Sequence, residues 1–239
     1  MPQYRSDEEK AAFAQRVRAF EERLLANMES VFVPVHLCLG QEWVSAEIYE
    51  SIEKDDWLFS NHRGHGHYLA KGGDEKKLWD EIMGLPSGLN QGFAGSQGIS
   101  DASLNFHASA IVGGLVGVAA GCAYALKADK SEAIAVCCVG DGGTEAGVFW
   151  EAANWAALNK LPVAFIVENN QKSVDSPIEE RQATPLIPRA AAFGLYPAAN
   201  IFDALNLARQ NEPSFYEARC KLECEHIYMA GMMPKEVIA

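Results

Sequence analysis

The chain has 239 residues, of which 49% are hydrophobic and 22% are charged, a composition typical of a globular protein with a buried core. Its 32 acidic residues outnumber its 20 basic residues and give a formal net charge of −12, which argues against a nucleic-acid-binding surface and against a polybasic membrane anchor. We therefore expect a soluble protein that binds neither nucleic acid nor membrane, folded as a single domain over residues 1–239.

The N-terminal segment MPQYRSDEEKAAFAQ lacks the apolar core of a secretory signal, and no apolar run approaches transmembrane length. Without a signal peptide, the six cysteines are expected to be reduced thiols, and the protein is expected to be cytoplasmic. Cys220, Cys224 and His226 offer an alternative, a small metal cluster. We consider it the weaker interpretation, because a structural zinc site takes four ligands at recognised spacings.

The first third of the chain predicts an N-terminal helical extension followed by loops. Ser6 and Glu9 resemble a capping box, and apolar residues then recur at helical spacing: Phe13, Val17, Phe20, Leu24 and Met28. A second helical stretch ends near Ile52. The polar, glycine- and histidine-rich segment 55–73 is predicted to be a loop, a helix is predicted over 74–83, and segment 85–103 is predicted to be a long loop.

The remaining chain alternates buried strands with helices. The apolar, small-residue segment 111–126 predicts a buried helix, and strands are predicted over 133–139 and 162–168 with a helix over 144–159 between them. Helical segments over 188–193 and 201–210 and a strand over 213–222 follow. This order predicts an α/β fold, an open parallel sheet with helices on both faces.

The unit of two strands and one helix places polar residues where ligands bind in such sheets. Asp141 follows the first strand and Asn170 follows the second, and the strands of such a strand–helix–strand unit lie parallel, joined by a right-handed crossover. The side chains therefore converge at the carboxyl edge of the sheet if the strands are neighbours. Gly142 and Gly143 leave the backbone without side chains just before a helix N-terminus, which suits the binding of a diphosphate. The carboxylate oxygen of Asp141 and the amide oxygen of Asn170 suit Mg²⁺.

Two other phosphate-binding motifs do not match this sequence. A dinucleotide fingerprint needs G-x-G-x-x-G, but counting from Gly140 places Glu145 where the third glycine belongs. A Walker A loop needs G-K-[ST] after its glycines, and the unit contains none.

The letters GDG followed by NN at the next strand end resemble the thiamine-diphosphate motif. The flanking segments HLCLGQE, HRGHGHYLAKGG, AIVGGLVGVAAG, LNKLPVAFIVENN, RAAAFGL and FYEARCKLECEH resemble the alpha subunits of 2-oxo-acid dehydrogenase E1 components, such as pyruvate dehydrogenase E1 alpha, over nearly the whole chain. The resemblance implies a transketolase-type fold with a thiamine-diphosphate-binding domain of the diphosphate type.

The resemblance also implies which residues hold the cofactor. Asp141, Asn170 and the backbone carbonyl of Lys172 would ligate Mg²⁺. Gly142 and Gly143 would offer backbone groups to the diphosphate.

Further residues of the site follow from the same resemblance. Arg63 would pair with diphosphate oxygens, and Val112 would contact the aminopyrimidine through its backbone. His65 and His67 would face the reacting carbon, and His226 is the histidine candidate of the closing loop.

Each assignment has a structural alternative. Asp141 could cap a helix, Asn170 could be a turn residue, Arg63 could be a solvated charge and Val112 could be simple core. The histidines His62, His65 and His67 could bind a metal together or lie at the surface, and His226 could be an exposed loop residue.

The chain also departs from the family. The segment between Gly194 and Phe215 lacks a usual turn and much of a helix, and AGSQGISD lacks a usual histidine. The resemblance implies an alpha-type subunit that acts with a beta-type subunit, as an α2β2 tetramer, to decarboxylate a 2-oxo acid and transfer the fragment to an acceptor. Alternatives are ketol or acyl transfer from a ketose, as in a split transketolase or carboligase, and a non-catalytic subunit.

Overall fold

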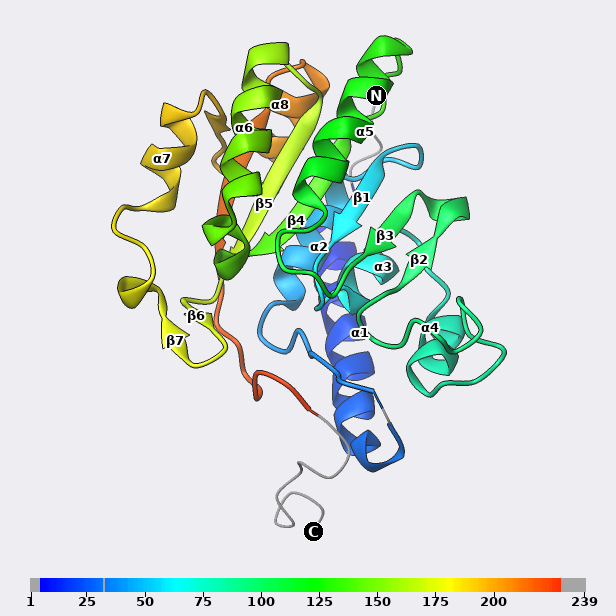
Figure 1. The fold of residues 1–239 in the computed structure, drawn as a ribbon. Helices are drawn as coiled ribbons and strands as arrows, with labels where there is room; N and C mark the ends of the chain where they lie inside the picture. Colours follow the sequence, from blue (N-terminus) through cyan, green and yellow to red (C-terminus); the bar gives the residue numbers. More distant parts are fainter. Residues whose placement is uncertain (1–4, 32, 229–239) are drawn as a thin grey trace.

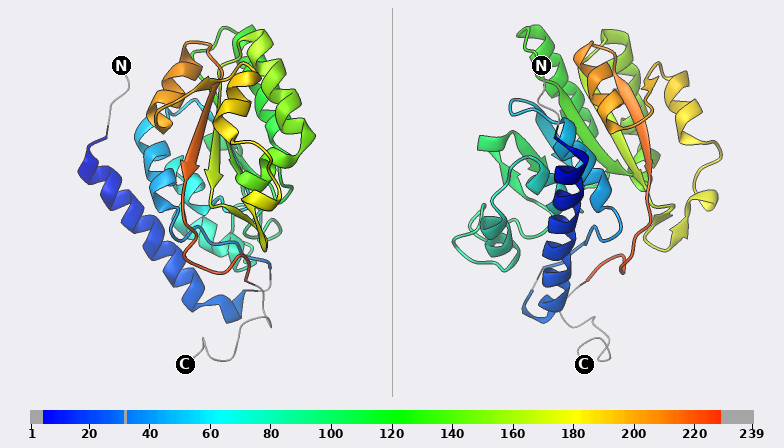
Figure 2. Two further views of the ribbon diagram at one scale, coloured as in Figure 1. Left: turned by 90° about the vertical axis from the view of Figure 1, so that its left-hand side faces the viewer. Right: turned by 180° about the vertical axis from the view of Figure 1, so that it is seen from behind.

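The fold is built around a central β-sheet with helices on both faces (Figures 1 and 2). A computed structural model describes residues 5–31 and 33–228. Its seven-stranded sheet has the order β2-β3-β1-β4-β5-β9-β8, and a separate two-stranded hairpin is formed by β6 and β7. The main strands are β1 (Trp57–Ser60), β3 (Phe106–Ala108), β4 (Ala135–Gly140), β5 (Val163–Asn169) and β9 (Ser214–Arg219).

Parallel pairing dominates the sheet. Strand β1 pairs in parallel with β3 on one side and with β4 on the other, and β4, β5, β9 and β8 (Tyr196–Pro197) continue in parallel. The short edge strand β2 (Ser100–Asp101) pairs antiparallel with β3. The hairpin strands are β6 (Lys172–Ser173) and β7 (Ser176–Pro177), which follow β5 in the chain. The predicted neighbourhood of β4 and β5, on which the site depends, is therefore confirmed.

One helical layer is formed by α1 (Asp7–Ala26), α2 (Glu42–Ser51), α3 (His65–Ala70) and α8 (Ile201–Arg209). The opposite layer is formed by α5 (Val116–Ala128), α6 (Gly147–Asn159) and α7 (Leu186–Ala192), as the left view of Figure 2 shows. Helix α4 (Glu75–Ile82) lies beyond the β2 edge (Figure 1). The remaining helical turns are short: Met28–Ser30, Ala102–Leu104, Asp141–Glu145 and Ile178–Glu180.

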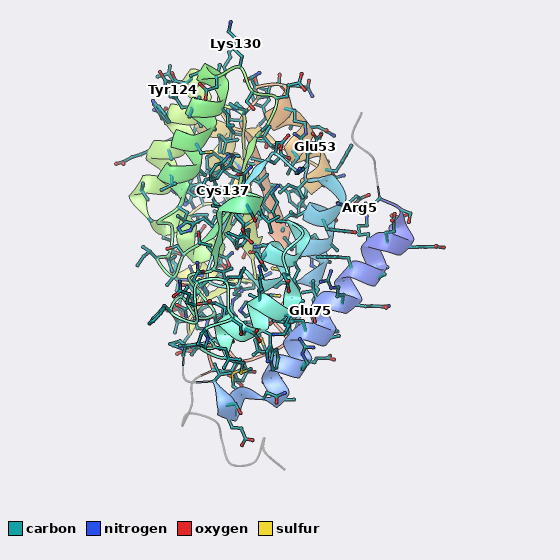
Figure 3. All side chains as sticks on the ribbon, turned by 90° about the vertical axis from the view of Figure 1, so that its right-hand side faces the viewer. Arg5, Glu53, Glu75, Tyr124, Lys130 and Cys137 are labelled. Carbon is teal, nitrogen blue, oxygen red and sulfur yellow. The ribbon has the colours of Figure 1, made fainter. Side chains whose placement is uncertain are left out.

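The alternation of side chains along the strands divides the core in two. On β4, Val136 and Cys138 pack with the layer of α1, α2 and α8, whereas Cys137 and Val139 pack with α5 and α6. Successive strand residues point to opposite faces, so an all-apolar strand must be covered on both sides. The cysteines of the described chain are all free thiols, and Cys137 lies inside the molecule in Figure 3.

The N-terminal helix has the structure that its sequence predicts. Ser6 accepts a hydrogen bond from the Glu9 amide, and the Glu9 carboxylate accepts one from the Ser6 amide, which completes the predicted capping box. The apolar residues of the predicted stripe are buried, and α1 packs chiefly against α2. The predicted strands over 133–139, 162–168 and 213–222 and the helix over 201–210 are also confirmed, with shifted ends.

Two predictions about local structure are wrong. Segment 55–73 is not a loop, because it contains β1 and α3, and all six residues of α3 are buried. The apolar segment 111–126 does not form one buried helix, since α5 begins at Val116 and exposes Val118 and Tyr124. Figure 3 shows Tyr124 projecting from α5 at the edge of the molecule.

Candidate functional site

A cavity opens at the carboxyl ends of the parallel strands. Four segments reach it directly from strand ends: Asn61–Arg63 after β1, 109–113 after β3, Asp141–Gly143 after β4 and Asn170 after β5. Residues from outside the sheet complete the wall, among them His36 and His226. This is the place where parallel α/β sheets bind ligands, because the connections leaving the strands diverge there.

The Asp141 carboxylate lies in the cavity wall and is almost fully buried. Its Oδ2 accepts a hydrogen bond of 2.6 Å from Nη2 of Arg181, which also forms an ion pair with Glu145. Burial raises the pKa of Asp141, while the hydrogen bond and charge of Arg181 oppose that rise. The side chain makes no cap on the following helical turn, so the alternative that Asp141 is a simple helix cap is wrong.

Asn170 lies at the end of the neighbouring strand and lines the same cavity. Its Oδ1 accepts from the amide of Lys172 at 3.1 Å, and its Nδ2 donates to Oε1 of Gln41 at 3.3 Å. The turn role considered for Asn170 is therefore present, and it positions the amide oxygen in the cavity wall rather than excluding it. Lys172 also lines the cavity, at the start of β6.

Three glycines leave the backbone bare beside these side chains. A Cβ atom on Gly142 would lie 2.6 Å from Oγ of Ser173, and one on Gly113 would lie 3.2 Å from the carbonyl oxygen of Gly143. Gly113 also has φ +73°, a left-handed conformation that favours glycine. The chain therefore passes close to itself at this wall and presents backbone atoms of Gly113, Gly142 and Gly143 to the cavity.

Arg63 is a buried cation in the cavity wall, with only 4% of its surface exposed. Its Nη1 donates to the carbonyl of Leu37 at 2.6 Å, and its Nη2 donates to the carbonyl of His226 at 3.0 Å. No carboxylate of the described residues lies within ion-pair distance of it, and burial lowers the pKa of Arg63. The alternative of a solvated loop charge is wrong, and an unpaired buried cation favours an anionic ligand.

Glu168, which sequence reasoning missed, organises the cavity floor. Its Oε1 accepts from Nε2 of Gln41 at 3.1 Å and its Oε2 accepts from Nδ2 of Asn61 at 2.6 Å. The carboxylate is almost fully buried and lines the cavity. An acidic residue inside the apolar run VAFIVE was the signal that could have identified it, because a buried carboxylate needs hydrogen-bond donors.

His65 and His67 do not face the cavity, contrary to the expectation from the sequence. His65 is fully buried between Glu21, whose Oε1 lies 2.8 Å from Nδ1, and Ser96, whose Oγ lies 2.8 Å from Nε2. His67 contacts Ser60, with 2.8 Å between Nδ1 and Oγ. Both side chains follow the inward face of α3 once this segment becomes helical, so they serve packing and hydrogen bonding. They also do not form a metal group with His62 among the described residues.

The histidines that do reach the cavity are His36, His62 and His226. Their ring centroids lie 4.5 Å apart for His36 and His62 and 5.3 Å apart for His36 and His226. Burial lowers the pKa of His36 and His62 to about 3, and the positive charge of Arg63 adds to this effect. Burial and Arg63 also lower the pKa of His226, so all three rings are neutral at neutral pH.

Comparison with known proteins agrees with this geometry. A model of the family described as "Dehydrogenase E1 component" matches residues 12–196, well over half of the chain. The chain belongs to this family. The match covers the cavity segments that carry Arg63, Val112, Asp141 and Asn170.

Curated E1-family relatives are similar over most of this chain. The alpha subunit of acetoin:2,6-dichlorophenolindophenol oxidoreductase from Bacillus subtilis is 37% identical over 75% of this chain and 55% of its own length. The alpha subunit of the pyruvate dehydrogenase E1 component from Zymomonas mobilis is 35% identical over 75% of this chain and 52% of its own length. The chain thus spans about half the length of these relatives.

The fold of this E1-family chain is also similar to that of a transketolase. The crystal structure of transketolase from Campylobacter jejuni has a TM-score of 0.66 and 20% sequence identity, and covers 95% of this chain and 42% of the transketolase chain. This likeness confirms the predicted α/β architecture. No helix among the described residues is long and apolar enough to cross a membrane.

The E1-family chain exposes apolar side chains beside the cavity mouth. Ile111 is 71% exposed and Val112 is 56% exposed, so the alternative of Val112 as simple core is wrong. On α5 and α6, Val118, Tyr124 and Leu158 are also exposed, with Leu158 at 78%. Ile111 and Val112 line the cavity, whereas the other three lie along these helices, and exposed large apolar side chains are typical of interaction surfaces.

Proposed function

We propose that the chain is the alpha-type, cofactor-holding subunit of a two-subunit enzyme that depends on thiamine diphosphate and Mg²⁺. One observation carries the proposal. Asp141 and Asn170, at the ends of neighbouring parallel strands, line the same cavity as the buried cation Arg63. Hard oxygen ligands beside an unpaired buried guanidinium suit a metal-bound diphosphate.

The donor set fits Mg²⁺. Asp141 supplies a carboxylate, Asn170 supplies an amide oxygen, and the carbonyl of Lys172 is the proposed third ligand, with the remaining positions left to phosphate oxygens and water. Arg181 holds Oδ2 of Asp141 in the structure, so it would give up that hydrogen bond when the metal binds.

The surrounding residues fit the rest of the cofactor. Arg63 would bind diphosphate oxygens, and Gly142 and Gly143 would approach them through backbone atoms, since no side chain stands in the way. Val112, which lies exposed in the cavity wall, would contact the aminopyrimidine through its backbone. When bound, thiamine diphosphate supplies the electron sink for carbanion chemistry at a carbonyl.

His226 is the catalytic histidine that we retain from the sequence. It lines the cavity, and its Nδ1 accepts from Nη2 of Arg63 at 3.3 Å, which leaves the proton on Nε2. A neutral imidazole with a proton on Nε2 can donate it to a substrate oxygen. We therefore assign His226 the role of a proton donor at the cavity mouth.

A beta-type partner completes this proposal. The side chain of Val112 lies exposed in the cavity wall, and Val118 and Tyr124 lie exposed along α5, so a partner that covered Val112 and the start of α5 would close the site. The carboxylate that activates the aminopyrimidine would come from that partner, as the family resemblance implies. We accordingly expect an α2β2 assembly, located in the cytoplasm, and an isolated chain without activity.

Two classes of donor substrate are candidates for the reaction, and experiment distinguishes them. The relatives are named for pyruvate and for acetoin, and we propose a 2-oxo acid or a related acyloin whose fragment passes to an acceptor. Ketol transfer from a ketose is the second candidate reaction. A non-catalytic subunit is the outcome if the cofactor does not bind.

The first experiment is calorimetric titration of thiamine diphosphate with Mg²⁺ into the chain, alone and with its beta-type subunit. Binding is expected to depend on Mg²⁺, to be lost in Asp141→Ala, and to be kept in Asp129→Ala, an exposed carboxylate after α5. Consumption of pyruvate, acetoin and a ketose phosphate by the complex then distinguishes the donors. Absence of binding even in the complex would refute the cofactor proposal.

A further inference from the structure

Three histidines from distant parts of the chain converge in the cavity wall. His36 precedes α2, His62 follows β1, and His226 belongs to the C-terminal segment after β9. Each offers one ring nitrogen, and these three nitrogens all lie within 4.8 Å of one another. Among the described residues this is the one group of His, Cys, Asp or Glu side chains with the spacing of a metal site.

The residues around His36 hold its imidazole ring in one orientation, which suits a metal-binding histidine. Nδ1 of His36 lies 2.8 Å from the side-chain amide of Gln97. The structure places Nε2 of Gln97 against this nitrogen as a donor, so the amide has to turn over, with its oxygen accepting, for Nδ1 of the ring to carry the proton and Nε2 of the ring to present its lone pair to the cluster. A hydrogen bond to the second ring nitrogen is the usual way in which proteins orient a metal-binding histidine.

His226 is free to contribute the third nitrogen. Its Nδ1 receives only a 3.3 Å contact from Nη2 of Arg63, whereas the same Nη2 donates to the His226 carbonyl at 3.0 Å. An ion could therefore replace the longer contact while Arg63 keeps its bond to the backbone.

We infer that His36, His62 and His226 form a second metal site, which binds a borderline-soft divalent ion of the Zn²⁺ class with one coordination position open toward the cavity. Three imidazoles select Zn²⁺, Ni²⁺ or Cu²⁺ over Mg²⁺, which prefers oxygen ligands. Three protein ligands and an open position are the arrangement of an accessible zinc site rather than a structural one. This inference uses none of the proposed Mg²⁺ ligands, and it shares only His226 with the proposed function, so Zn²⁺ binding can be tested apart from binding of the cofactor.

The test is calorimetric titration of ZnCl₂ into the chelator-stripped full chain, in a buffer without thiols or phosphate. We expect one ion per chain. His226→Ala is the main variant, because its partly exposed side chain can be removed with little effect on folding. His36→Gln and His62→Gln keep polar side chains at the more buried positions. Each variant should weaken Zn²⁺ binding by more than about tenfold, as expected for the loss of a coordinate bond.

Matched variants separate this site from other zinc-binding groups. His107→Ala removes a histidine on β3 that is outside the cluster, and Cys220→Ser with Cys224→Ser removes the thiols near His226. Both should bind Zn²⁺ like the unaltered chain, and the visible spectrum of the Co²⁺ form should indicate nitrogen ligands without thiolate bands.

Three results would overturn the inference: no Zn²⁺ binding by the unaltered chain, unchanged binding in all three histidine variants, or loss of binding in the double cysteine variant. Asp141→Ala keeps the two proposals apart. It should abolish Mg²⁺-dependent binding of thiamine diphosphate and leave Zn²⁺ binding intact.

Discussion

Arg181 donates a hydrogen bond from Nη2 to Oδ2 of Asp141 across 2.6 Å, so an arginine after β7 covers the carboxylate at the end of β4. The guanidinium is held there by Glu145 and by the carbonyl of Ser176, which accepts from Nε at 3.1 Å. Arg181 thus occupies one face of the group that we propose as a metal ligand, and metal binding must compete with it.

Replacing this arginine should strengthen Mg²⁺-dependent binding of thiamine diphosphate. In Arg181→Gln the carboxylate of Asp141 no longer has a cation to exchange for the metal, and we expect an affinity gain of about fivefold, corresponding to ~1 kcal/mol. Calorimetry in the presence of the beta-type subunit measures it. Arg189→Gln is the control, because Arg189 bonds to Thr184 and not to Asp141. Weaker binding in Arg181→Gln would instead indicate that Arg181 helps to hold the diphosphate.

The buried histidines of the cavity should make the fold sensitive to acid. Burial lowers the pKa of His36 and His62 to about 3, whereas the unfolded value is 6.5. Between these values the unfolded chain binds protons that the folded chain does not, so the free energy of unfolding falls as the pH decreases from 6.5 toward 3. Arg63 and His226 face the same rings and oppose their protonation.

Urea unfolding with a chelator present, compared at neutral and mildly acidic pH, checks this expectation. The double variant His36→Gln and His62→Gln should lose less stability on acidification than the unaltered chain, because the carboxylates contribute equally to both. Parallel losses in the two proteins would contradict the assigned pKa shifts.

A single carboxylate should hold the loop that carries Gln97. Glu81 in α4 is fully buried, and its two oxygens accept hydrogen bonds from the amides of Asn90 at 2.6 Å, Gly92 at 3.0 Å, Ala94 at 2.7 Å and Gly95 at 3.2 Å. Removing this acceptor takes the partner from four amides, of which that of Gly95 is buried and the others are partly buried. We expect Glu81→Ala to lose ~3 kcal/mol of unfolding free energy, and Glu81→Gln to lose less because it keeps one oxygen.

Chemical denaturation of both Glu81 variants measures these losses. Glu132→Gln, at an exposed position before β4, serves as the control and should be nearly neutral. A neutral effect of Glu81→Ala would mean that the loop is held by other contacts.

Reaction with diethyl pyrocarbonate should divide the histidines by location. His65 and His67, at 0% and 1% exposure, should be protected in the folded chain, whereas the partly exposed His107 and His226 should react. Mass spectrometry of peptides, before and after unfolding in urea, reports each site. Rapid labelling of His65 in the folded protein would contradict its place between Glu21 and Ser96.

Local sequence patterns determined much of the fold and part of the site. The capping box of Ser6 and Glu9 defines the start of α1, and the apolar runs around Cys137 and Phe165 define β4 and β5. These elements depend on periodicity and on interactions between near neighbours in the chain, which are visible in the letters. The positions of Asp141 and Asn170 followed from the rule that parallel strands end at one edge of the sheet.

Long-range packing decided the rest. The polar segment with His65 and His67 becomes helical and buried because its imidazoles find hydrogen-bond partners, and both partners of His65, Glu21 and Ser96, lie far away in the sequence. For the same reason, the sequence could not show that Arg181 donates a hydrogen bond to the carboxylate of Asp141.

The sequence by itself therefore determined the family resemblance, the main strands and the positions of Asp141 and Asn170 at strand ends, since each depends on local pattern or on one simple topological rule. Only the tertiary structure decided which polar side chains face the cavity. It buried His65 and brought His36, His62 and His226 together, because hydrogen-bond satisfaction of buried groups depends on the whole fold.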